Sequence, residues 1–324
     1  MSITPAEVFQ YARENERHDV VRAVAHTLRR QFQKVPGTYT PSVRLSGKYL
    51  GTRAGFSNAV QGRLCNTIAS WNSDIDISRI DWERTNQLTE DKYLLLEDYY
   101  DDSLIDDIQS QVDELVEDDE NSVIRGRHDD LITSRCVHHP TAKIPELKEL
   151  VDDTIMGIAE GFFDAHFRPV TMRCMRNYHV PEEIVQESMS FADYWHCDQH
   201  PVDAIKIFVS LHDIGEENGP LHIVRSGESR DIFKQSFKRD HHGVPGAYVE
   251  DNATVETFTG PAGSAAFAKT NEILHRASNP AEGKHRDVVL IYGYATDQPL
   301  PDDWFEQIEP EYDKDMTAQF GTSS

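Results

Sequence analysis

The sequence predicts a mainly β fold with flanking helices, in which short strands form a sandwich or a barrel. After Pro169, short apolar runs are separated by clusters of Gly, Pro, Asn and Asp, which is typical of antiparallel strands rather than of a parallel α/β sheet. Before Pro169, apolar residues recur at helical spacing. Hydrophobic residues make up 38% of the 324 residues, enough for a packed core, so disorder of the whole chain is excluded.

We expect three regions along the chain. Residues 1–90 are an appended segment that is partly helical, because residues 5–34 carry apolar side chains at three- and four-residue steps after Pro5. Residues 91–300 form the main domain, and residues 301–324 form an acidic C-terminal tail.

Two helices and a strand are expected in the first half of the main domain. The run KYLLLEDYY predicts a strand, and the helix after it places Leu104, Ile108, Val112 and Leu115 on one face, with acidic residues on the other. A second helix is expected over residues 145–165, beginning at a proline and ending near Arg168-Pro169.

The second half of the main domain contains the expected strands. They are read from VTMRCMRNYHV, AIKIFVSLHDI, GPLHIVRS, ATVETFTG, GSAAFAK and DVVLIYGYA, which are bounded by turn-forming residues.

Charge and cysteine usage exclude several classes of protein. The chain carries 56 acidic and 32 basic residues, a formal net charge of −24, and no basic patch, so we expect no nucleic-acid partner. It has no apolar run long enough to span a bilayer and no signal-peptide pattern, so we expect no membrane partner. The four cysteines form no CxxC pair, which favours reduced thiols in a cytoplasmic protein.

The segment WHCD supplies the first candidate metal ligands. Residues two apart in a strand point to the same face, so His196 and Asp198 can converge on one point, while Cys197 between them points away. Two histidines and one carboxylate on one octahedral face form the site of non-haem iron oxygenases. A third ligand is therefore needed from a later strand, and His275 is the best placed.

A turn follows His275 and predicts a hairpin. The residues NPAEG precede an apolar strand, and a turn centred between Pro280 and Ala281 places His275 opposite Arg286 on neighbouring strands. The planar guanidinium of an arginine binds a carboxylate through two parallel hydrogen bonds. The pattern therefore predicts a metal ligand beside a carboxylate clamp, as a chelating keto acid requires.

Residues 92–295 resemble the phytanoyl-CoA dioxygenase family of iron- and 2-oxoglutarate-dependent oxygenases. The resemblance is carried by KYLLLEDYYDDSLIDDIQSQVDEL, WHCD, ENGPLHIVRSG and LHRASNPAEGKHRDVVLIYG. The family motif is H-x-D, a distal histidine, and an arginine about eleven positions later. His196, Asp198, His275 and Arg286 match this motif.

The resemblance implies a fold and a reaction. The fold is a double-stranded β-helix core, a jelly-roll or cupin-like barrel wrapped by helices. The reaction uses Fe(II) held by the three motif ligands, with 2-oxoglutarate and dioxygen as cosubstrates and the far carboxylate of 2-oxoglutarate on Arg286. The implied enzyme is an oxidoreductase that hydroxylates a small-molecule substrate with release of succinate and CO2. Halogenation is disfavoured, because halogenases of related fold lack the carboxylate that Asp198 supplies.

One segment departs from the family pattern. Family members often carry Gly-Ser-His after the Asn-Gly turn, whereas this chain has Ser226-Gly227-Glu228. We expect that turn to lie away from the metal ligands. Neither the substrate nor the oligomeric state is predicted.

Further side chains are candidates for the pocket. Arg173 and Asn177, on one predicted strand, are placed within reach of the keto acid or the substrate, and Tyr194 shares strand parity with His196. For each of these three, an ordinary packing role is the competing interpretation.

Other histidines are weighed as alternative ligands. His196 and His200 have zinc spacing for a helix, but Pro201 disfavours a helix there. The adjacent pairs His138-His139 and His241-His242 are expected in surface loops with diverging side chains, and His212-Asp213 does not share a face. Two rival functions also stay open: a non-catalytic jelly-roll module that binds a metal or metabolite, and a zinc-dependent cupin-like hydrolase or isomerase.

Overall fold

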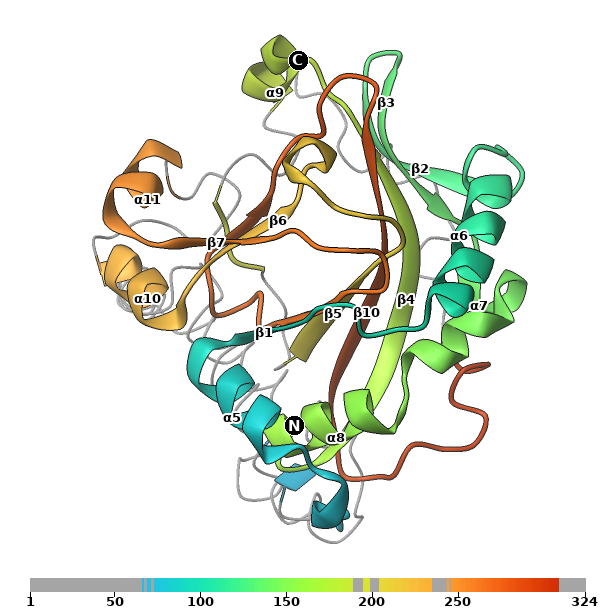
Figure 1. Cartoon of the computed structure of the whole chain (residues 1–324), viewed down its shortest axis with the longest axis vertical. Coiled ribbons are helices and arrows are strands. Elements are labelled where there is room, and N and C mark those ends of the chain that lie inside the picture. The colour runs from blue at the N-terminus through green and yellow to red at the C-terminus, as the bar shows by residue number, and fades with distance from the viewer. Residues whose placement is uncertain are drawn as a thin grey trace, which may run out of the picture.

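Two antiparallel sheets form the centre of the molecule (Figure 1). The computed structural model describes residues 66, 69–70, 73–188, 195–198, 204–234, 244 and 246–308. The large sheet has seven strands in the order β1-β8-β5-β10-β4-β3-β2, and the small sheet has three in the order β7-β6-β9. The strands of the two sheets are β1 (Tyr93–Leu96), β2 (Ser122–His128), β3 (Leu131–Val137), β4 (His166–Tyr178), β5 (Ala204–Ser210), β6 (Leu221–Val224), β7 (Val255–Phe258), β8 (Ala265–Ala268), β9 (His275–Ala277) and β10 (His285–Thr296).

Helices flank these sheets. They are η1 (Ile77–Arg79), α5 (Trp82–Asp91), α6 (Asp102–Val116), α7 (Pro140–Lys143), η2 (Pro145–Leu150), α8 (Asp153–Phe163), α9 (Glu182–Ser188), η3 (Glu216–Asn218), α10 (Ser226–Lys234) and α11 (Gly246–Asn252). Figure 1 places α6, α7 and α8 along the large sheet and α10 and α11 beside the small one.

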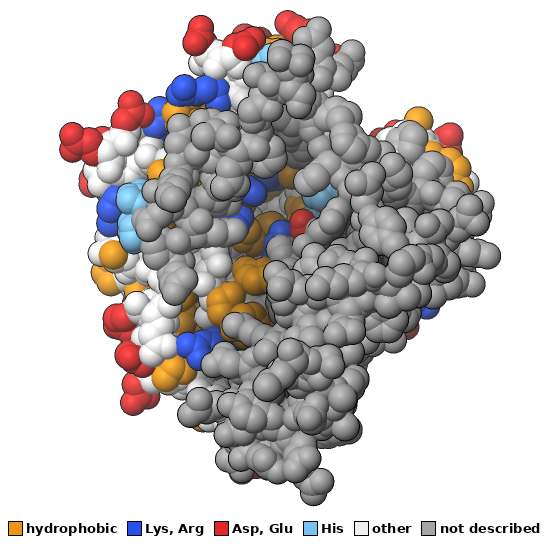
Figure 2. All heavy atoms as spheres, turned by 180° about the vertical axis from the view of Figure 1, so that it is seen from behind, with side chains coloured by type: hydrophobic (Ala, Val, Ile, Leu, Met, Phe, Trp, Pro, Cys, Tyr) orange, Lys and Arg blue, Asp and Glu red, His pale blue; other side chains and the backbone are white. Residues whose placement is uncertain are grey.

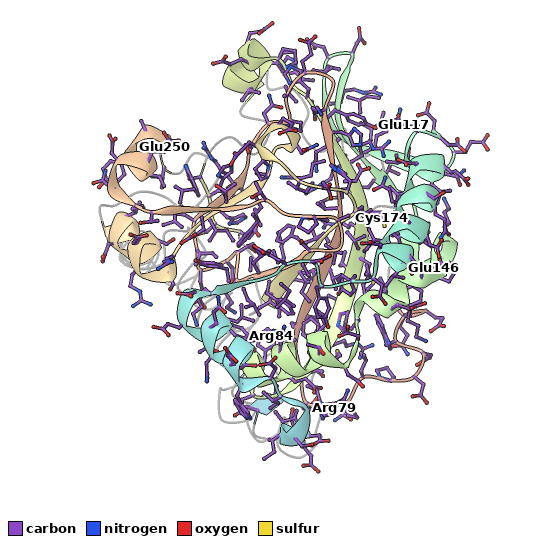
Figure 3. All side chains as sticks on the ribbon, in the orientation of Figure 1. Arg79, Arg84, Glu117, Glu146, Cys174 and Glu250 are labelled. Carbon is purple, nitrogen blue, oxygen red and sulfur yellow. The ribbon has the colours of Figure 1, made fainter. Side chains whose placement is uncertain are left out.

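The main core lies between the large sheet and its helices. Alternate residues of the strands point into this core, including Cys174 of β4, Ile207 of β5 and Val289 of β10. The side chain of Cys174 lies on the side of β4 that faces α6 (Figure 3). The residues directly before and after these core residues in each strand therefore point to the opposite face of the large sheet, which we call the inner face. On that face Phe208 contacts apolar residues of the small sheet, so the two sheets pack against each other.

The helix α6 is amphipathic, but its buried face differs slightly from the expected one. Ile105, Ile108, Val112 and Val116 are buried, at three- and four-residue spacing. The expected Leu104 and the residue at position 115 lie at the edge of this stripe and are only partly buried against the core. The predicted helix is confirmed, and its apolar face is rotated by about one residue.

The second expected helix is interrupted. Residues 145–150 form the 3₁₀ helix η2, and α8 begins separately because the Asp152 side chain accepts a hydrogen bond from the backbone N–H of Ile155 at 2.8 Å. The helix ends at Phe163, not near Pro169. Pro169 lies within β4, opposite Gly293, where the register shifts. A proline has no N–H to donate to the ladder, and it is tolerated at this position because the regular pairing is interrupted there.

Several elements were not predicted from the sequence. Among the longer ones, they are α5, the β2–β3 hairpin, α9, α10 and α11. The helix α5 contributes the buried Leu88 to the main core, and Trp304, Phe305 and Ile308 contribute to it after residue 300. The expected helix over residues 5–34 lies outside the described residues. The domain boundaries after residues 90 and 300 stay predictions.

Two further findings concern membranes and thiols. Within the described residues, the structure contains no helix that is long and apolar enough to cross a membrane. Cys136, Cys174 and Cys197 are buried free thiols, and burial raises the pKa of Cys136 and Cys174.

Candidate metal centre

The structure brings His196, Asp198 and His275 together. One ligand atom from each lies within 4.8 Å of the others. His196 and His275 are paired by two backbone hydrogen bonds of 3.1 and 3.0 Å, and their rings are 4.4 Å apart. The backbone N–H of Asp198 donates to the carbonyl of Thr270 at 2.9 Å, which fixes the third side chain. The set combines two imidazoles with one carboxylate, the donors that ferrous iron accepts.

The His275 side chain has the protonation state of a metal ligand. It is buried, and its Nδ1 lies 3.2 Å from the carbonyl oxygen of Ile273, so Nδ1 carries the proton and Nε2 is left free to bind. Burial, and secondarily the neighbouring His196 ring, lowers the pKa of His275 to about 3, with Asp198 acting in the opposite direction. At neutral pH the imidazole is therefore neutral, and Nε2 lies 3.7 Å from Asp198 Oδ2.

Cys197 points away from this centre, as expected. Its thiol donates to the carbonyl of Ile273 at 2.9 Å, and the side chain packs with Trp195 and other apolar residues behind the small sheet. Ser226-Gly227-Glu228 begins α10. In that helix the buried Ser229 hydroxyl accepts a hydrogen bond from the backbone N–H of Leu274, next to His275.

Lys206 is a residue of the centre that sequence reasoning missed. Its Nζ lies 2.6 Å from Asp198 Oδ2, and both side chains are largely buried. Burial lowers the pKa of Lys206, an effect that Asp198 opposes. The signal in the sequence was a single charged residue within the apolar run AIKIFVS. Lys206 lies two residues before Phe208 in β5, so its side chain also points to the inner face.

The predicted hairpin between His275 and Arg286 is wrong. The strand β9 pairs with β6 of the small sheet, whereas β10 pairs with β4 and β5 of the large sheet. The intervening turn crosses between the sheets, and Asn279 is anchored by two side-chain hydrogen bonds to the backbone of Val180. Residues face each other across a hairpin turn only when the two strands belong to one ladder, and β9 and β10 do not.

Arg286 nevertheless lies on the inner face of the large sheet. Its Nη1 donates to the carbonyl of Gly219, and within the described part of the chain it forms no ion pair and its buried Nε has no partner. Burial, followed by the charge of Arg125, lowers the pKa of Arg286 to about 10. A buried guanidinium without a counter-charge is costly, and a bound carboxylate would remove that cost.

The turn beneath Arg286 requires a glycine. Gly219 has a φ of 72°, and a Cβ there would meet the carbonyl of Ser278 and, at 2.8 Å, the nitrogen of Pro280. The amide of Asn218 donates to the carbonyl of His285 at 3.2 Å, which ties this turn to the start of β10. The Asn-Gly turn thus positions the strand end that carries the arginine.

The remaining sequence candidates have different outcomes. Asn177 lies opposite Arg286 in the register, is buried, and has an Nδ2 without a partner in the described structure. Arg173 lies opposite Leu290 on the inner face. Tyr194 lies outside the described residues.

An ion pair behind the inner face holds β4 and β10 together. Asp287 is fully buried and accepts hydrogen bonds from Arg176 Nε at 2.8 Å and Nη2 at 2.5 Å. Arg176 also pairs with Asp113 and with Glu117, which lies at the end of α6 (Figure 3). The pair immediately follows Arg286 in one strand and precedes Asn177 in the other.

A second cluster of histidines adjoins this ion pair. One ligand atom each from His212, His285 and Asp287 lies within 4.8 Å of the others. However, His212 Nε2 accepts the backbone N–H of Asp287 at 3.1 Å, and both Asp287 carboxylate oxygens accept from Arg176. The donors are therefore engaged in a protein network, which fits a structural role better than a metal site.

Of the other alternative histidines, only His138 and His139 lie within the described residues, and they are not part of the ligand set that contains the triad. His138 and His139 lie between β3 and α7 with their rings 4.1 Å apart, so the expectation that they diverge is wrong. The cause is the left-handed backbone of His139, with a φ of 52°. His200, His241 and His242 lie outside the described residues.

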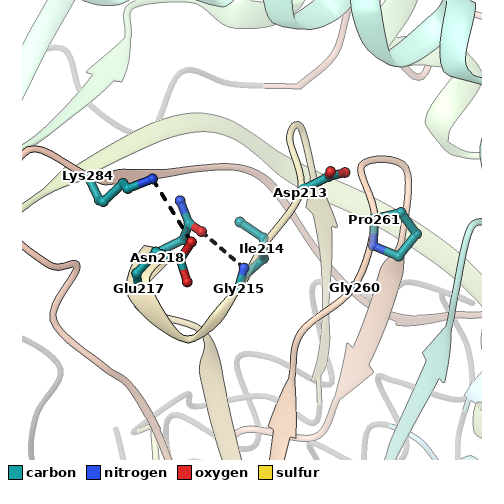
Figure 4. A pocket seen from close by; sticks show the side chains of 8 residues that line it. All are labelled: Asp213, Ile214, Gly215, Glu217, Asn218, Gly260, Pro261 and Lys284. Carbon is teal, nitrogen blue, oxygen red and sulfur yellow. Dashed lines mark hydrogen bonds and ion pairs between the residues drawn. The ribbon is translucent and has the colours of Figure 1, made fainter.

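A separate surface pocket lies away from these candidates. It has a volume of about 500 Å³ and is bordered by loops rather than by the triad (Figure 4). Asp213 and Glu217 contribute acidic groups, and Lys284 lies 4.0 Å from Glu217. None of the candidate ligands lines it.

Known proteins similar in sequence are oxygenases. No family model matches the chain. It is 32% identical to the ectoine dioxygenase of Bordetella parapertussis (strain 12822 / ATCC BAA-587 / NCTC 13253), over 31% of this chain and 40% of that protein. It is 28% identical to the L-proline trans-4-hydroxylase of Streptomyces griseoviridis, over 33% of this chain and 47% of that protein. The resemblance to the phytanoyl-CoA dioxygenase family is confirmed. The matches span less than half the length of either relative.

Solved structures share the fold. The non-haem α-ketoglutarate-dependent epimerase SnoN from nogalamycin biosynthesis matches with a TM-score of 0.51 and 16% identity, over 66% of this chain and 82% of that one. EctD from S. alaskensis, crystallised with 2-oxoglutarate and 5-hydroxyectoine, matches with a TM-score of 0.50 and 17% identity, over 75% and 89%. The predicted double-stranded β-helix core is therefore confirmed.

Proposed function

We propose that this chain is an Fe(II)- and 2-oxoglutarate-dependent dioxygenase that hydroxylates a small molecule and releases succinate and CO2. The observation that carries the proposal is the convergence of His196, Asp198 and His275, which come from separate segments and offer ligand atoms within 4.8 Å of one another. Three protein ligands on one face leave positions for a chelating cosubstrate and for dioxygen.

The three side chains have distinct tasks in this proposal. His275 presents Nε2 because its Nδ1 donates to a backbone carbonyl. His196 is aligned by its two backbone hydrogen bonds with His275. Asp198 supplies the negative charge that offsets the metal. Bound iron with 2-oxoglutarate and dioxygen would supply the oxidative chemistry, while the protein orients the groups and excludes water.

The cosubstrate is proposed to bind through its far carboxylate at Arg286. The guanidinium has no ion pair in the described structure, and the free amide of Asn177 lies opposite it in the register. Both donors fit a carboxylate. Arg173, on the inner face, and Tyr194, by its strand parity with His196, are proposed to line the same pocket.

The relatives support a small-molecule substrate. Ectoine dioxygenase and L-proline trans-4-hydroxylase are named for reactions on small molecules, and EctD was crystallised with 5-hydroxyectoine. We also propose a cytoplasmic location and no nucleic-acid partner, which the net charge of −24 and the buried free cysteines support.

Succinate production tests the reaction. The purified chain, supplied with Fe(II), 2-oxoglutarate and oxygen and screened against small molecules, is expected to release succinate, and Asp198→Ala is expected to abolish this release. Activity that zinc restores instead of iron would favour the cupin-like zinc enzyme. Ligand binding without any turnover across the screen would favour the non-catalytic module. Undiminished succinate release by Asp198→Ala would overturn the ligand assignment.

The cosubstrate clamp has a separate test. Arg286→Lys keeps the charge but loses the two-pronged geometry, so 2-oxoglutarate affinity should fall about ten- to a hundredfold, the cost of one charge-assisted hydrogen bond. Iron affinity should stay unchanged, because Arg286 is not a ligand. Anaerobic titration that follows the visible band of the iron–keto-acid chelate measures both. Equal 2-oxoglutarate affinities would mean that another cation holds the far carboxylate.

A further inference from the structure

The end of β10 that carries Arg286 extends past its neighbour β5. The ladder between the two strands runs from Tyr294 to Val288, which lies opposite Ser210, the last residue of β5. Arg286 and the buried Asp287 therefore lie beyond the end of this ladder. Buried backbone N–H and C=O groups are almost always paired, so this strand end needs hydrogen-bond partners from another segment.

The loop that follows β5, residues 211–219, supplies these partners. The N–H of Leu211 donates to the carbonyl of Asp287 at 3.2 Å. The side-chain amide of Asn218, which Figure 4 shows on this loop, donates to the carbonyl of His285 at 3.2 Å. The loop therefore holds the main chain of β10 on both sides of the clamp arginine.

His212 is the side chain of this loop that binds the N–H of Asp287. Its Nε2 accepts that N–H at 3.1 Å, so Nδ1 carries the ring proton and donates to the carbonyl of Asp213 at 2.8 Å. The ring also lies edge-on to that of His285, with the ring centres 5.3 Å apart. The imidazole thus takes the place of a strand partner, because it connects the main chain of the loop to the main chain of β10.

The opposite edge of the same residue is held by β4. Asp287 lies opposite Arg176, which donates two hydrogen bonds to its carboxylate. Successive side chains of a strand alternate, so Asp287 points away from the inner face and Arg286 points toward it. His212 and Arg176 together fix the backbone at Asp287, and this fixes the direction in which the guanidinium leaves the strand.

We propose that His212 is a positioning residue for the cosubstrate clamp: by accepting the Asp287 N–H, it orients Arg286 toward the far carboxylate of 2-oxoglutarate. This inference rests on the proposed function and adds a residue to it. Two parallel hydrogen bonds between a guanidinium and a carboxylate require a defined orientation, so a displaced strand end weakens binding there and not at the metal. Figure 2 shows a hollow in the surface with basic and hydrophobic side chains inside it, a lining that fits an anionic cosubstrate.

Two substitutions of His212 test this role. His212→Ala removes the acceptor, whereas the Oε1 of His212→Gln can take the position of Nε2 and accept the same N–H. The Fe(II)-loaded chain is titrated anaerobically with 2-oxoglutarate, and the visible chelate band is followed. His212→Ala should bind 2-oxoglutarate about three- to tenfold more weakly, the range of one net hydrogen bond, and His212→Gln should restore the wild-type affinity. Fe(II) affinity should be equal in all three chains, because the loop carries none of the proposed metal ligands.

His166→Ala is the matched control. His166 is a partly buried histidine at the far end of the same sheet ladder, where it lies opposite Thr296 and its Nδ1 is 3.0 Å from Glu160 Oε1. This variant should lower the Tm and keep the wild-type affinity for 2-oxoglutarate. The comparison therefore separates orientation of the clamp from a general loss of stability.

Hydrogen exchange gives a readout that needs neither iron nor cosubstrate. In the chain without ligands, peptides that cover residues 285–290 should exchange faster in His212→Ala than in wild type, because the Asp287 amide loses its acceptor. The exchange in His212→Gln should return to the wild-type rate. His212→Leu, which also lacks the acceptor, replaces His212→Ala if the alanine variant does not fold.

Unchanged 2-oxoglutarate affinity in a His212→Ala chain whose exchange is faster would overturn the proposal, because the clamp would then not depend on this hydrogen bond. Equal weakening in His166→Ala would also overturn it, since lost stability alone would explain the effect. Failure of His212→Gln to restore affinity would count against the acceptor role in the same way. A wild-type chain that forms no chelate band would instead refute the proposed function itself.

Discussion

The buried ion pair between Arg176 and Asp287 should contribute strongly to stability. The side chain of Asp287 is 0% accessible to solvent and that of Arg176 is 8% accessible. Water therefore cannot solvate the Asp287 carboxylate when Arg176 is removed. In Arg176→Met, the amide of Gln109, at 2.9 Å, remains as a donor to the carboxylate. Leaving one buried charge without its partner costs about 3–5 kcal/mol. That loss corresponds to a fall in Tm of roughly 6–20 °C for a domain of this size.

Urea unfolding at pH 7, followed by circular dichroism, measures this loss of stability. The double variant Arg176→Met/Asp287→Leu should recover most of the lost stability, because apolar residues often replace a buried ion pair without cost. Arg84→Met is the control, since Arg84 forms a partly exposed pair with Asp81 (Figure 3) that should contribute about 0–1 kcal/mol. A loss below about 1 kcal/mol in Arg176→Met would refute this reasoning.

Three further predictions address packing, the metal centre and the thiols. Gly157→Ala should destabilise by about 1–3 kcal/mol in urea unfolding, because the added Cβ would clash with the backbone of η1, whereas Gly227→Ala, which meets nothing within 4 Å, should not destabilise. Lys206→Met should lower the Tm of the metal-free chain because it removes the ammonium that pairs with Asp198, and Fe(II) should raise that Tm more than it raises the wild-type value; equal increments would contradict this. In a Cys65→Ser background, the three buried cysteines should react with a thiol reagent only after unfolding, and rapid reaction of the native chain would contradict it.

The convergence of the metal ligands could be predicted because it depends on local geometry. His196 and Asp198 share a face through strand alternation, and the need for a third ligand pointed to His275. The structure places these three together. The wrong hairpin arose because the partner of a strand is a long-range choice: β9 pairs with β6, which is about fifty positions away in sequence.

Local signals also limited the prediction of helices. The cap at Asp152 separates η2 from α8, but the apolar pattern across it is continuous, so the sequence favoured one helix. Lys206 was missed because an isolated charge in an apolar strand has no meaning until its partner, Asp198, is known.

Iron stoichiometry tests the central claim most directly. Anaerobic equilibrium dialysis of Fe(II) against the wild-type chain and against Asp198→Ala and His275→Ala, with 2-oxoglutarate present, measures the affinity and the number of ions bound. We predict one iron per wild-type chain, and binding at least about tenfold weaker in each variant, as expected when a ligand is lost. Unchanged stoichiometry and affinity in both variants would show that the iron binds elsewhere and would contradict the assignment of His196, Asp198 and His275 as its ligands.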